Sequence, residues 1–115
     1  MGKADPTSRT EIPPGTLYML ILRSLARLGP MHGYGIASHI QQQSDDVLQV
    51  EEGSLYPALQ RMLIKGWVVA EWGQSENNRR ARYYSLTPAG RKQLTVEISE
   101  FERVMAAIGR VIQPA

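Results

Sequence analysis

Residues 53–63 carry the sequence Gly-Ser-Leu-Tyr-Pro-Ala-Leu-Gln-Arg-Met-Leu. The large apolar residues of this stretch recur at the i, i+4, i+7 and i+8 spacing of one helix face, namely Leu55, Leu59, Met62 and Leu63. The opposite face of the predicted helix would carry Ser54, Pro57, Ala58 and Arg61. Ser54 is the candidate N-cap, so that Pro57 falls in the first turn, where the missing backbone N–H has no intrahelical partner. Gly66 supplies the C-terminal stop.

A two-stranded hairpin is predicted directly after this helix. Apolar and polar residues alternate over residues 68–72 and again over residues 83–86, with a polar loop at residues 73–80 between them. Burial in the hairpin is the simpler account of Trp67 and Trp72. A helix fits the major groove of B-DNA, and a cationic hairpin can hold the neighbouring phosphates. The order therefore predicts a recognition helix followed by a wing.

Two further helices are predicted before the recognition helix. The first spans residues 14–28, because proline suits a first turn and Gly29-Pro30 ends the pattern. One stripe of this helix comprises Leu17, Leu20, Ile21, Leu25 and Leu28. Three more apolar residues, Tyr18, Met19 and Leu22, fall outside the stripe, so the helix is expected to contact two partners. A shorter helix follows at residues 34–43, and residues 1–13, with little to bury, are predicted to be a flexible arm.

A long helix is predicted at the C-terminal end, with Thr87 as N-cap and Pro88 as first residue, running to about Ile112. Its apolar residues follow the heptad spacing of a coiled coil. Pairing of the first and last helices of two subunits would use both apolar sides of the first helix. The predicted dimer interface comprises Leu17, Ile21, Leu94, Ile98, Phe101, Met105, Ile108 and Ile112. The alternative, for part of the apolar stripe of the last helix, is packing on the first helix of the same chain.

The predicted fold is α+β, mostly α, with a winged helix-turn-helix domain at residues 14–87 and a C-terminal dimerisation helix at residues 88–115. A chain of 115 residues has room for one modest core. The absence of cysteine excludes disulfides and thiolate metal sites. The longest apolar run, residues 17–22, is far shorter than the roughly 20 residues of a membrane span. We therefore expect a cytoplasmic protein with no membrane partner.

Three arginines mark the predicted wing as a candidate DNA contact. Arg79, Arg80 and Arg82 lie within four positions, and each guanidinium can make bidentate bonds to phosphate oxygens. The formal net charge of the chain is only +2, so this local clustering has to carry the argument. A solvated hairpin, whose arginines only aid solubility, is the alternative.

The recognition helix supplies the remaining candidate contacts. Gln60 and Arg61 are of the types that pair with adenine and guanine edges, and Ser54 is a further polar residue able to face outward. Tyr56 is placed either against a phosphate or at the edge of the buried face, where its hydroxyl would meet water.

No catalytic, cofactor or metal site is predicted. His32 and His39 could bind a metal only with nearby carboxylates, and two imidazoles seven residues apart, one of them in a turn, form a weak pattern. The serines lie in no nucleophile elbow, and the chain has no glycine-rich phosphate loop. The sequence therefore predicts a protein that is not an enzyme.

Four motifs in order closely resemble the PadR family of bacterial transcriptional regulators, over about Pro14 to the C-terminus. They are His32-Gly33-Tyr34-Gly35, residues 52–59 (Glu-Gly-Ser-Leu-Tyr-Pro-Ala-Leu), Gly66-Trp67-Val68 and residues 82–90 (Arg-Tyr-Tyr-Ser-Leu-Thr-Pro-Ala-Gly). The resemblance implies a winged helix-turn-helix dimer, usually a repressor, that binds an inverted-repeat operator through its third helix and wing. It implies DNA contacts at Ser54, Tyr56, Pro57, Arg61 and the wing arginines.

The expected function is that of a dimeric, sequence-specific DNA-binding regulator whose partners are double-stranded operator DNA and a second copy of the chain. Some short relatives bind flat aromatic drugs between subunits on a tryptophan of the last helix, whereas here that helix offers only Phe101. A small apolar or aromatic effector at the dimer interface stays open. The rivals are a winged-helix module that binds a protein partner and a small-molecule-binding dimer without specific DNA binding.

Overall fold

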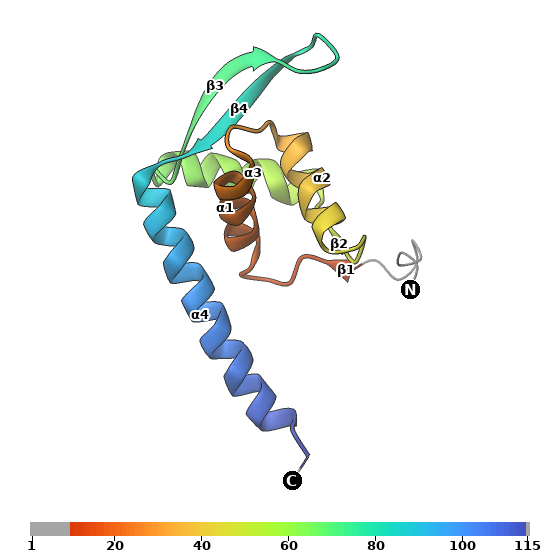
Figure 1. The fold of residues 1–115 in the computed structure, drawn as a ribbon, viewed down its shortest axis with the longest axis vertical. Helices are drawn as coiled ribbons and strands as arrows, with labels where there is room; N and C mark the ends of the chain where they lie inside the picture. Colours follow the sequence, from red (N-terminus) through yellow and green to blue (C-terminus); the bar gives the residue numbers. More distant parts are fainter. Residues whose placement is uncertain (1–9, 115) are drawn as a thin grey trace.

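The computed structural model describes residues 10–114, which form a body of three helices with a hairpin above it and a long helix leaving it (Figure 1). The elements in chain order are β1 (Thr10–Glu11), α1 (Leu17–Leu28), α2 (Gly33–Gln43), β2 (Leu48–Gln49), α3 (Glu52–Ile64), β3 (Val68–Gln74), β4 (Arg80–Leu86) and α4 (Pro88–Ile112). This order confirms the predicted α+β, mostly α, winged helix-turn-helix fold.

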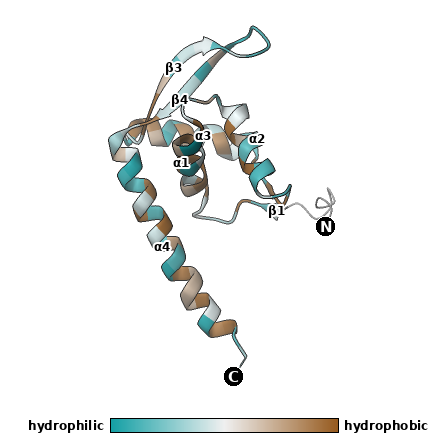
Figure 2. Cartoon of the chain, viewed as in Figure 1, coloured by the Kyte–Doolittle hydropathy of each residue, from teal (hydrophilic) through white to brown (hydrophobic). Residues whose placement is uncertain are grey.

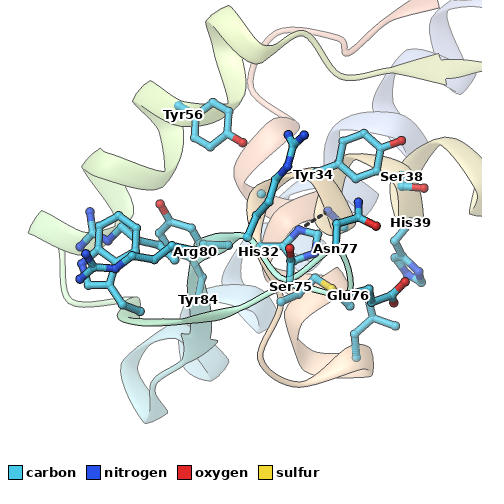
Figure 3. A pocket seen from close by; sticks show the side chains of 18 of the residues that line it. His32, Tyr34, Ser38, His39, Tyr56, Ser75, Glu76, Asn77, Arg80 and Tyr84 are labelled. Atoms are coloured by element: carbon cyan, nitrogen blue, oxygen red, sulfur yellow. Dashed lines mark hydrogen bonds between the residues drawn. The ribbon is translucent and has the colours of Figure 1, made fainter.

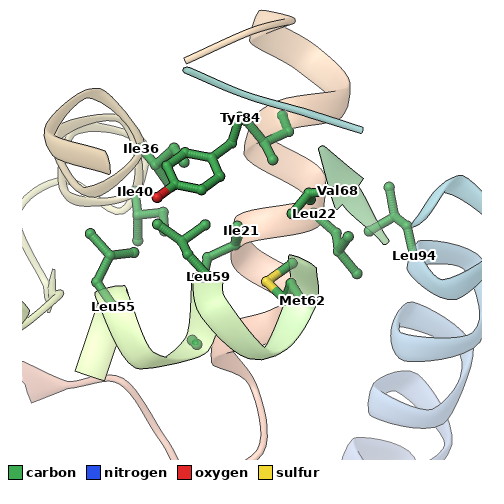
Figure 4. Packing of buried hydrophobic residues seen from close by; sticks show 12 residues of the cluster. Ile21, Leu22, Ile36, Ile40, Leu55, Leu59, Met62, Val68, Tyr84 and Leu94 are labelled. Carbon is green, nitrogen blue, oxygen red and sulfur yellow. The ribbon is translucent and has the colours of Figure 1, made fainter. Parts of the chain in front are cut away.

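The core lies where α1, α2 and α3 meet the root of the hairpin and the start of α4 (Figure 4). Its members are Ile21, Leu22, Leu25, Ile36, Ile40, Leu55, Ala58, Leu59, Met62, Val68, Tyr84 and Leu94. Burying one large aliphatic side chain contributes roughly 1.5–3 kcal/mol, so this cluster is the main force that fixes the helices to one another. Because Val68 and Tyr84 belong to the cluster, the hairpin is anchored to the same core as α3.

The hairpin pairs β3 and β4 antiparallel, from Val68 opposite Leu86 to Gln74 opposite Arg80. At its root, Met31 from the loop between α1 and α2 exchanges two backbone hydrogen bonds with Tyr84, at 2.9 and 3.1 Å. At its tip the chain turns through residues 75–79. The root is therefore fixed to the body, while the tip extends beyond it (Figure 1).

The start of α4 is capped as predicted. The Thr87 hydroxyl oxygen accepts a hydrogen bond from the Gly90 N–H at 3.0 Å and donates to the Gly66 carbonyl at 2.6 Å. Glycine is required at position 90, because a Cβ there would overlap the backbone carbonyl of Trp67. The helix ends at Ile112 as predicted, and its apolar residues continue toward the far end, away from the body (Figure 2).

Two predicted helix starts are wrong. Helix α1 begins at Leu17 rather than Pro14, because Gly15 has a left-handed φ of +83° and the Thr16 hydroxyl donates to the Pro13 carbonyl in a preceding turn. Helix α3 begins at Glu52 with Glu51 as N-cap, so Ser54 is not the cap. Pro57 consequently lies inside α3, where its missing N–H leaves out one helix hydrogen bond.

Two predicted side-chain orientations are also wrong. Ala58 is fully buried, because a methyl group fits beside the core leucines on the inward side of α3. Trp72 is 59% exposed rather than buried, since it lies in the part of β3 nearer the hairpin tip.

Residues 10–12 of the predicted flexible arm, residues 1–13, make defined contacts with the rest of the chain. Thr10 and Glu11 pair in parallel with Leu48 and Gln49, and Ile12 packs against the core cluster. Residues 1–9, the rest of the predicted arm, lie outside the described residues.

Candidate nucleic-acid interface

A groove of about 1180 Å³ separates the hairpin from one side of α2 and from the exposed flank of α3 (Figure 3). Tyr34 of α2 and Tyr56 of α3 point into it. Gln60 lines it from α3, and Arg79, Arg80 and Arg82 line it from the hairpin. The groove thus brings together five of the eight predicted DNA-binding residues: Tyr56, Gln60, Arg79, Arg80 and Arg82.

Tyr56 presents its hydroxyl to the groove as a hydrogen-bond donor. Its ring lies so close to Gly33 that a Cβ at that position would overlap it, and the side chain remains 45% exposed. Partial burial, with smaller effects of Glu52 and Tyr84, raises the pKa of the Tyr56 hydroxyl above its usual value. The hydroxyl is therefore protonated at neutral pH and can donate to a phosphate oxygen.

Arg61 lies on the other flank of α3 and does not line the groove. Its Nε donates to the Tyr18 hydroxyl of α1 at 2.6 Å, and its Cζ lies 5.7 Å from the centre of the Tyr18 ring. The structure therefore separates Arg61 from the other predicted contacts. Ser54 and Pro57 are exposed on α3 but do not line the groove either.

The hairpin wall of the groove combines arginines with an aromatic ring. The Cζ atoms of Arg80 and Arg82 lie 4.7 and 5.8 Å from the centre of the Trp72 ring, within the range of cation–π interactions. Sequence reasoning missed Trp72 because it assigned both tryptophans to burial. The signal that could have found it is the strand register, which places Trp72 directly opposite Arg82.

The N-terminal end of α2 supplies two further groove residues that sequence reasoning did not select. His32 caps this helix, because its Nδ1 accepts the Gly35 N–H at 3.0 Å, and its ring meets the Tyr83 ring edge-on at 5.4 Å. Tyr34 is 75% exposed beside it. Across residues 10–114, no group of three or more His, Cys, Asp or Glu residues could hold a metal ion.

Charge in the groove is positive. The three hairpin arginines face a single carboxylate among the lining residues, Glu76 at the tip. A helix flank with amide and hydroxyl groups opposite a cationic hairpin offers donors for base edges and for phosphates at once.

The pattern of the PadR-like family of transcriptional regulators matches residues 21–96, which include α3, the hairpin and the start of α4. This chain belongs to the PadR-like family. It is accordingly a DNA-binding transcriptional regulator and not an enzyme. No helix in the described range is long and apolar enough to cross a membrane.

Solved structures and a curated relative resemble this PadR-like regulator over most of its length. A transcriptional regulator from Clostridium thermocellum has a TM-score of 0.78 and 27% identity, covering 86% of this chain and 95% of that one. A PadR family regulator from Clostridium difficile has a TM-score of 0.70 and 26% identity, covering 84% and 98%. A 37.1 kDa protein in a transposon of Streptomyces fradiae is 40% identical over 84% of this chain, which spans 25% of that protein's length.

The predicted dimer-interface residues fall into three groups in the PadR-like chain. Ile21 is fully buried and Leu94 is 7% exposed, so the chain's own core already covers them. The assignment of Ile21 to the interface is therefore wrong, because it has no surface left for a partner. Leu17 and Ile98 are half-buried against the same core. Phe101, Met105, Ile108 and Ile112 remain exposed on α4.

Proposed function

We propose that this PadR-like regulator is a homodimeric repressor that binds an inverted-repeat operator through α3 and the hairpin. One observation carries the proposal: the groove that places Tyr56 and Gln60 opposite Arg80 and Arg82. In the proposed complex Gln60 contacts a base edge, and Tyr56 and the arginines bind phosphates. A repressor acts by occupying its promoter and needs no chemistry of its own.

Arg61 has a different role in this proposal. Its hydrogen bond and ring contact with Tyr18 connect α3 to α1 outside the groove. Arg61 therefore positions α3, whereas Ser54 and Pro57, which are exposed near its N-terminal end, stay candidate backbone contacts. To contact a base, Arg61 would first have to break its hydrogen bond with the Tyr18 hydroxyl.

The second copy of the chain is proposed to pair through α4. Phe101, Met105, Ile108 and Ile112 are 37–75% exposed and continue the heptad spacing from Leu94. Helices with such a stripe pair to remove it from water. Because a two-fold dimer presents two recognition helices, half-sites about 34–36 Å apart would be read together.

A small apolar or aromatic effector would bind between the two α4 helices, beside Phe101. It would release the operator only by preferring a subunit spacing that the DNA-bound dimer does not adopt. We place the protein in the cytoplasm, because a regulator has to share a compartment with its promoter.

The test is fluorescence anisotropy with a duplex from upstream of the protein's own gene and with a scrambled duplex, each at two salt concentrations. We expect a preference of about a thousandfold or more for the native duplex. Arg80→Ala should weaken both duplexes and reduce the salt slope by about 1, whereas Gln60→Ala should cost about 1–3 kcal/mol on the native duplex alone. Arg110→Ala is the matched control, since that exposed arginine lies near the far end of α4.

Each contrary result has a distinct meaning. Equal, salt-sensitive binding to both duplexes would contradict operator recognition while keeping DNA binding. If Arg80→Ala and Arg110→Ala had the same salt slope, the hairpin would not be part of the DNA interface. No binding to any duplex would favour the protein-partner module.

A further inference from the structure

Trp72 stands out on the hairpin because it is a large apolar ring left in solvent. The hairpin root is buried, with Val68 at 1% and Tyr84 at 6% exposure, but Trp72 is 59% exposed. Its indole N–H makes no hydrogen bond within residues 10–114. Tryptophan is enriched at interfaces, where one edge packs and its N–H finds a partner, so an exposed indole that lines the groove is a candidate binding residue.

The ring is the centre of a stack on one face of the hairpin. Arg82 lies directly opposite Trp72 in the strand register, and Arg80 lies two residues further toward the tip. Their guanidinium carbons lie 5.8 and 4.7 Å from the indole centre, and Arg82 is also 5.9 Å from the centre of the Tyr84 ring. A guanidinium held against a ring keeps its N–H edge free for an anion.

Trp67 provides the internal contrast. It packs edge-on against Tyr18, with ring centres 5.4 Å apart, and it is half-buried against the core outside the groove. The cation on its ring, Lys65, lies 5.1 Å away at the C-terminal end of α3. Each tryptophan therefore has its own cation–π contact, but the two differ in exposure and in location.

We infer that Trp72 is a DNA-backbone contact of the wing and the residue that positions Arg80 and Arg82 for phosphate. The free edge of the indole donates its N–H to a phosphate oxygen. Holding two arginines in place before binding lowers the conformational entropy that they lose in the complex. The partner is duplex DNA rather than an acidic protein surface, because Gln60 and Tyr56 face the same groove from a helix. The inference rests on the proposed DNA binding.

Two single-tryptophan variants of the full chain test the contact. In Trp67→Phe all tryptophan emission comes from Trp72, and in Trp72→Phe it comes from Trp67. Acrylamide quenching is measured with and without saturating upstream duplex. We expect the duplex to lower the quenching constant of Trp72 and to leave that of Trp67 unchanged. Quenching of Trp72 that the duplex does not alter would overturn the contact.

Removing the ring tests the positioning role. Trp72→Ala should weaken binding to both duplexes about tenfold, the loss of one to two cation–π contacts, and reduce the salt slope by about 1 to 2. Trp72→Phe should lose the indole N–H contact but keep the salt slope of the wild type, because it leaves a ring under the guanidinium groups. Far-UV circular dichroism should match the wild type for both variants, since Trp72 lies outside the core.

The outcomes separate this inference from the proposed function. If the wild type binds the duplex and Trp72→Ala binds equally well with an unchanged salt slope, the positioning role is wrong and operator binding stands. If the wild type binds no duplex, both proposals fail together.

Discussion

The winged body and the outer half of α4 differ in how their apolar residues are covered. In the body, the core side chains from α1, α2 and α3 are no more than 5% exposed, so contacts within one chain complete that core. On α4 the exposure rises from 7% at Leu94 to 44% at Ile108 and 75% at Ile112. The body is thus a closed folding unit that carries the groove beside the hairpin, whereas residues 10–114 leave the apolar stripe on the outer half of α4 uncovered.

The largest effect is expected from a change that makes the apolar stripe of α4 polar. The double variant Met105→Glu, Ile108→Glu should convert the proposed dimer to a monomer in sedimentation, because both side chains would carry charge into the helix pairing. Operator affinity should fall about 100-fold or more with the loss of bivalency, while the body keeps its fold. Ser99→Glu, an exposed polar position on the same helix, is the control. A double variant that still sediments as a dimer would contradict the pairing through α4.

Truncating one large aliphatic side chain on each side of the contrast gives the next effect. Leu59→Ala should cost about 2–5 kcal/mol in urea unfolding, because it opens a cavity in a fully buried site. Ile108→Ala, measured at a concentration too low for dimers, should have little effect on unfolding, since its surroundings are solvent. Equal losses in the two variants would mean that the chain itself covers Ile108.

The two glycines of α4 test whether the start of this helix and its outer half have different surroundings. Gly90→Ala should cost about 1–3 kcal/mol, because its Cβ meets the Trp67 carbonyl and backbone has to move. A Cβ added by Gly109→Ala meets no atom of residues 10–114 within 4 Å, so this variant should stabilise the monomer by up to about 1 kcal/mol through helix propensity. Thermal unfolding at low and high protein concentration measures both. If Gly109→Ala lowered the stability at low protein concentration, the outer half of α4 would not be surrounded by solvent in the monomer.

The smallest effect is expected for the exposed ion pair on α4. Arg103 donates two hydrogen bonds to Glu100, at 2.6 and 3.1 Å, and this contact lowers the pKa of the Glu100 carboxyl. A lowered carboxyl pKa contributes stability above the ordinary glutamate range and loses it as the pH falls through the folded pKa. Because both side chains are solvated, Glu100→Gln should shift the unfolding midpoint at pH 7 by no more than the error of the measurement. A clear shift would mean that the pair is buried in the dimer.

Local patterns predicted most of the fold. The i, i+4, i+7 spacing located α3, the cap at Thr87 located the start of α4, and the left-handed Gly66 follows α3 where the stop was predicted. The start of α3 was misplaced, because Ser54 is a good cap type but Glu51 takes that position. Caps compete over a few residues, and the packing of the whole helix decides between them.

The candidate site was predicted in part. The groove contains Tyr56, Gln60 and the hairpin arginines, all of which the residue types had indicated. Arg61 was grouped with them because helix spacing alone does not say which flank faces the hairpin. Trp72 was left out because strand alternation does not say where a strand leaves the core.

The sequence by itself determined the order of the four helices and the hairpin, their approximate bounds and the long apolar stripe of α4. Those features depend on neighbouring residues and on the helix and strand periods. Only the tertiary structure decided that Arg61 binds Tyr18, 43 residues away, and that Gly90 meets the Trp67 carbonyl. It also decided that Trp72 stacks with two arginines and remains exposed to solvent. These outcomes depend on how elements distant in the chain pack around one core, and that packing sets which side chains reach the groove.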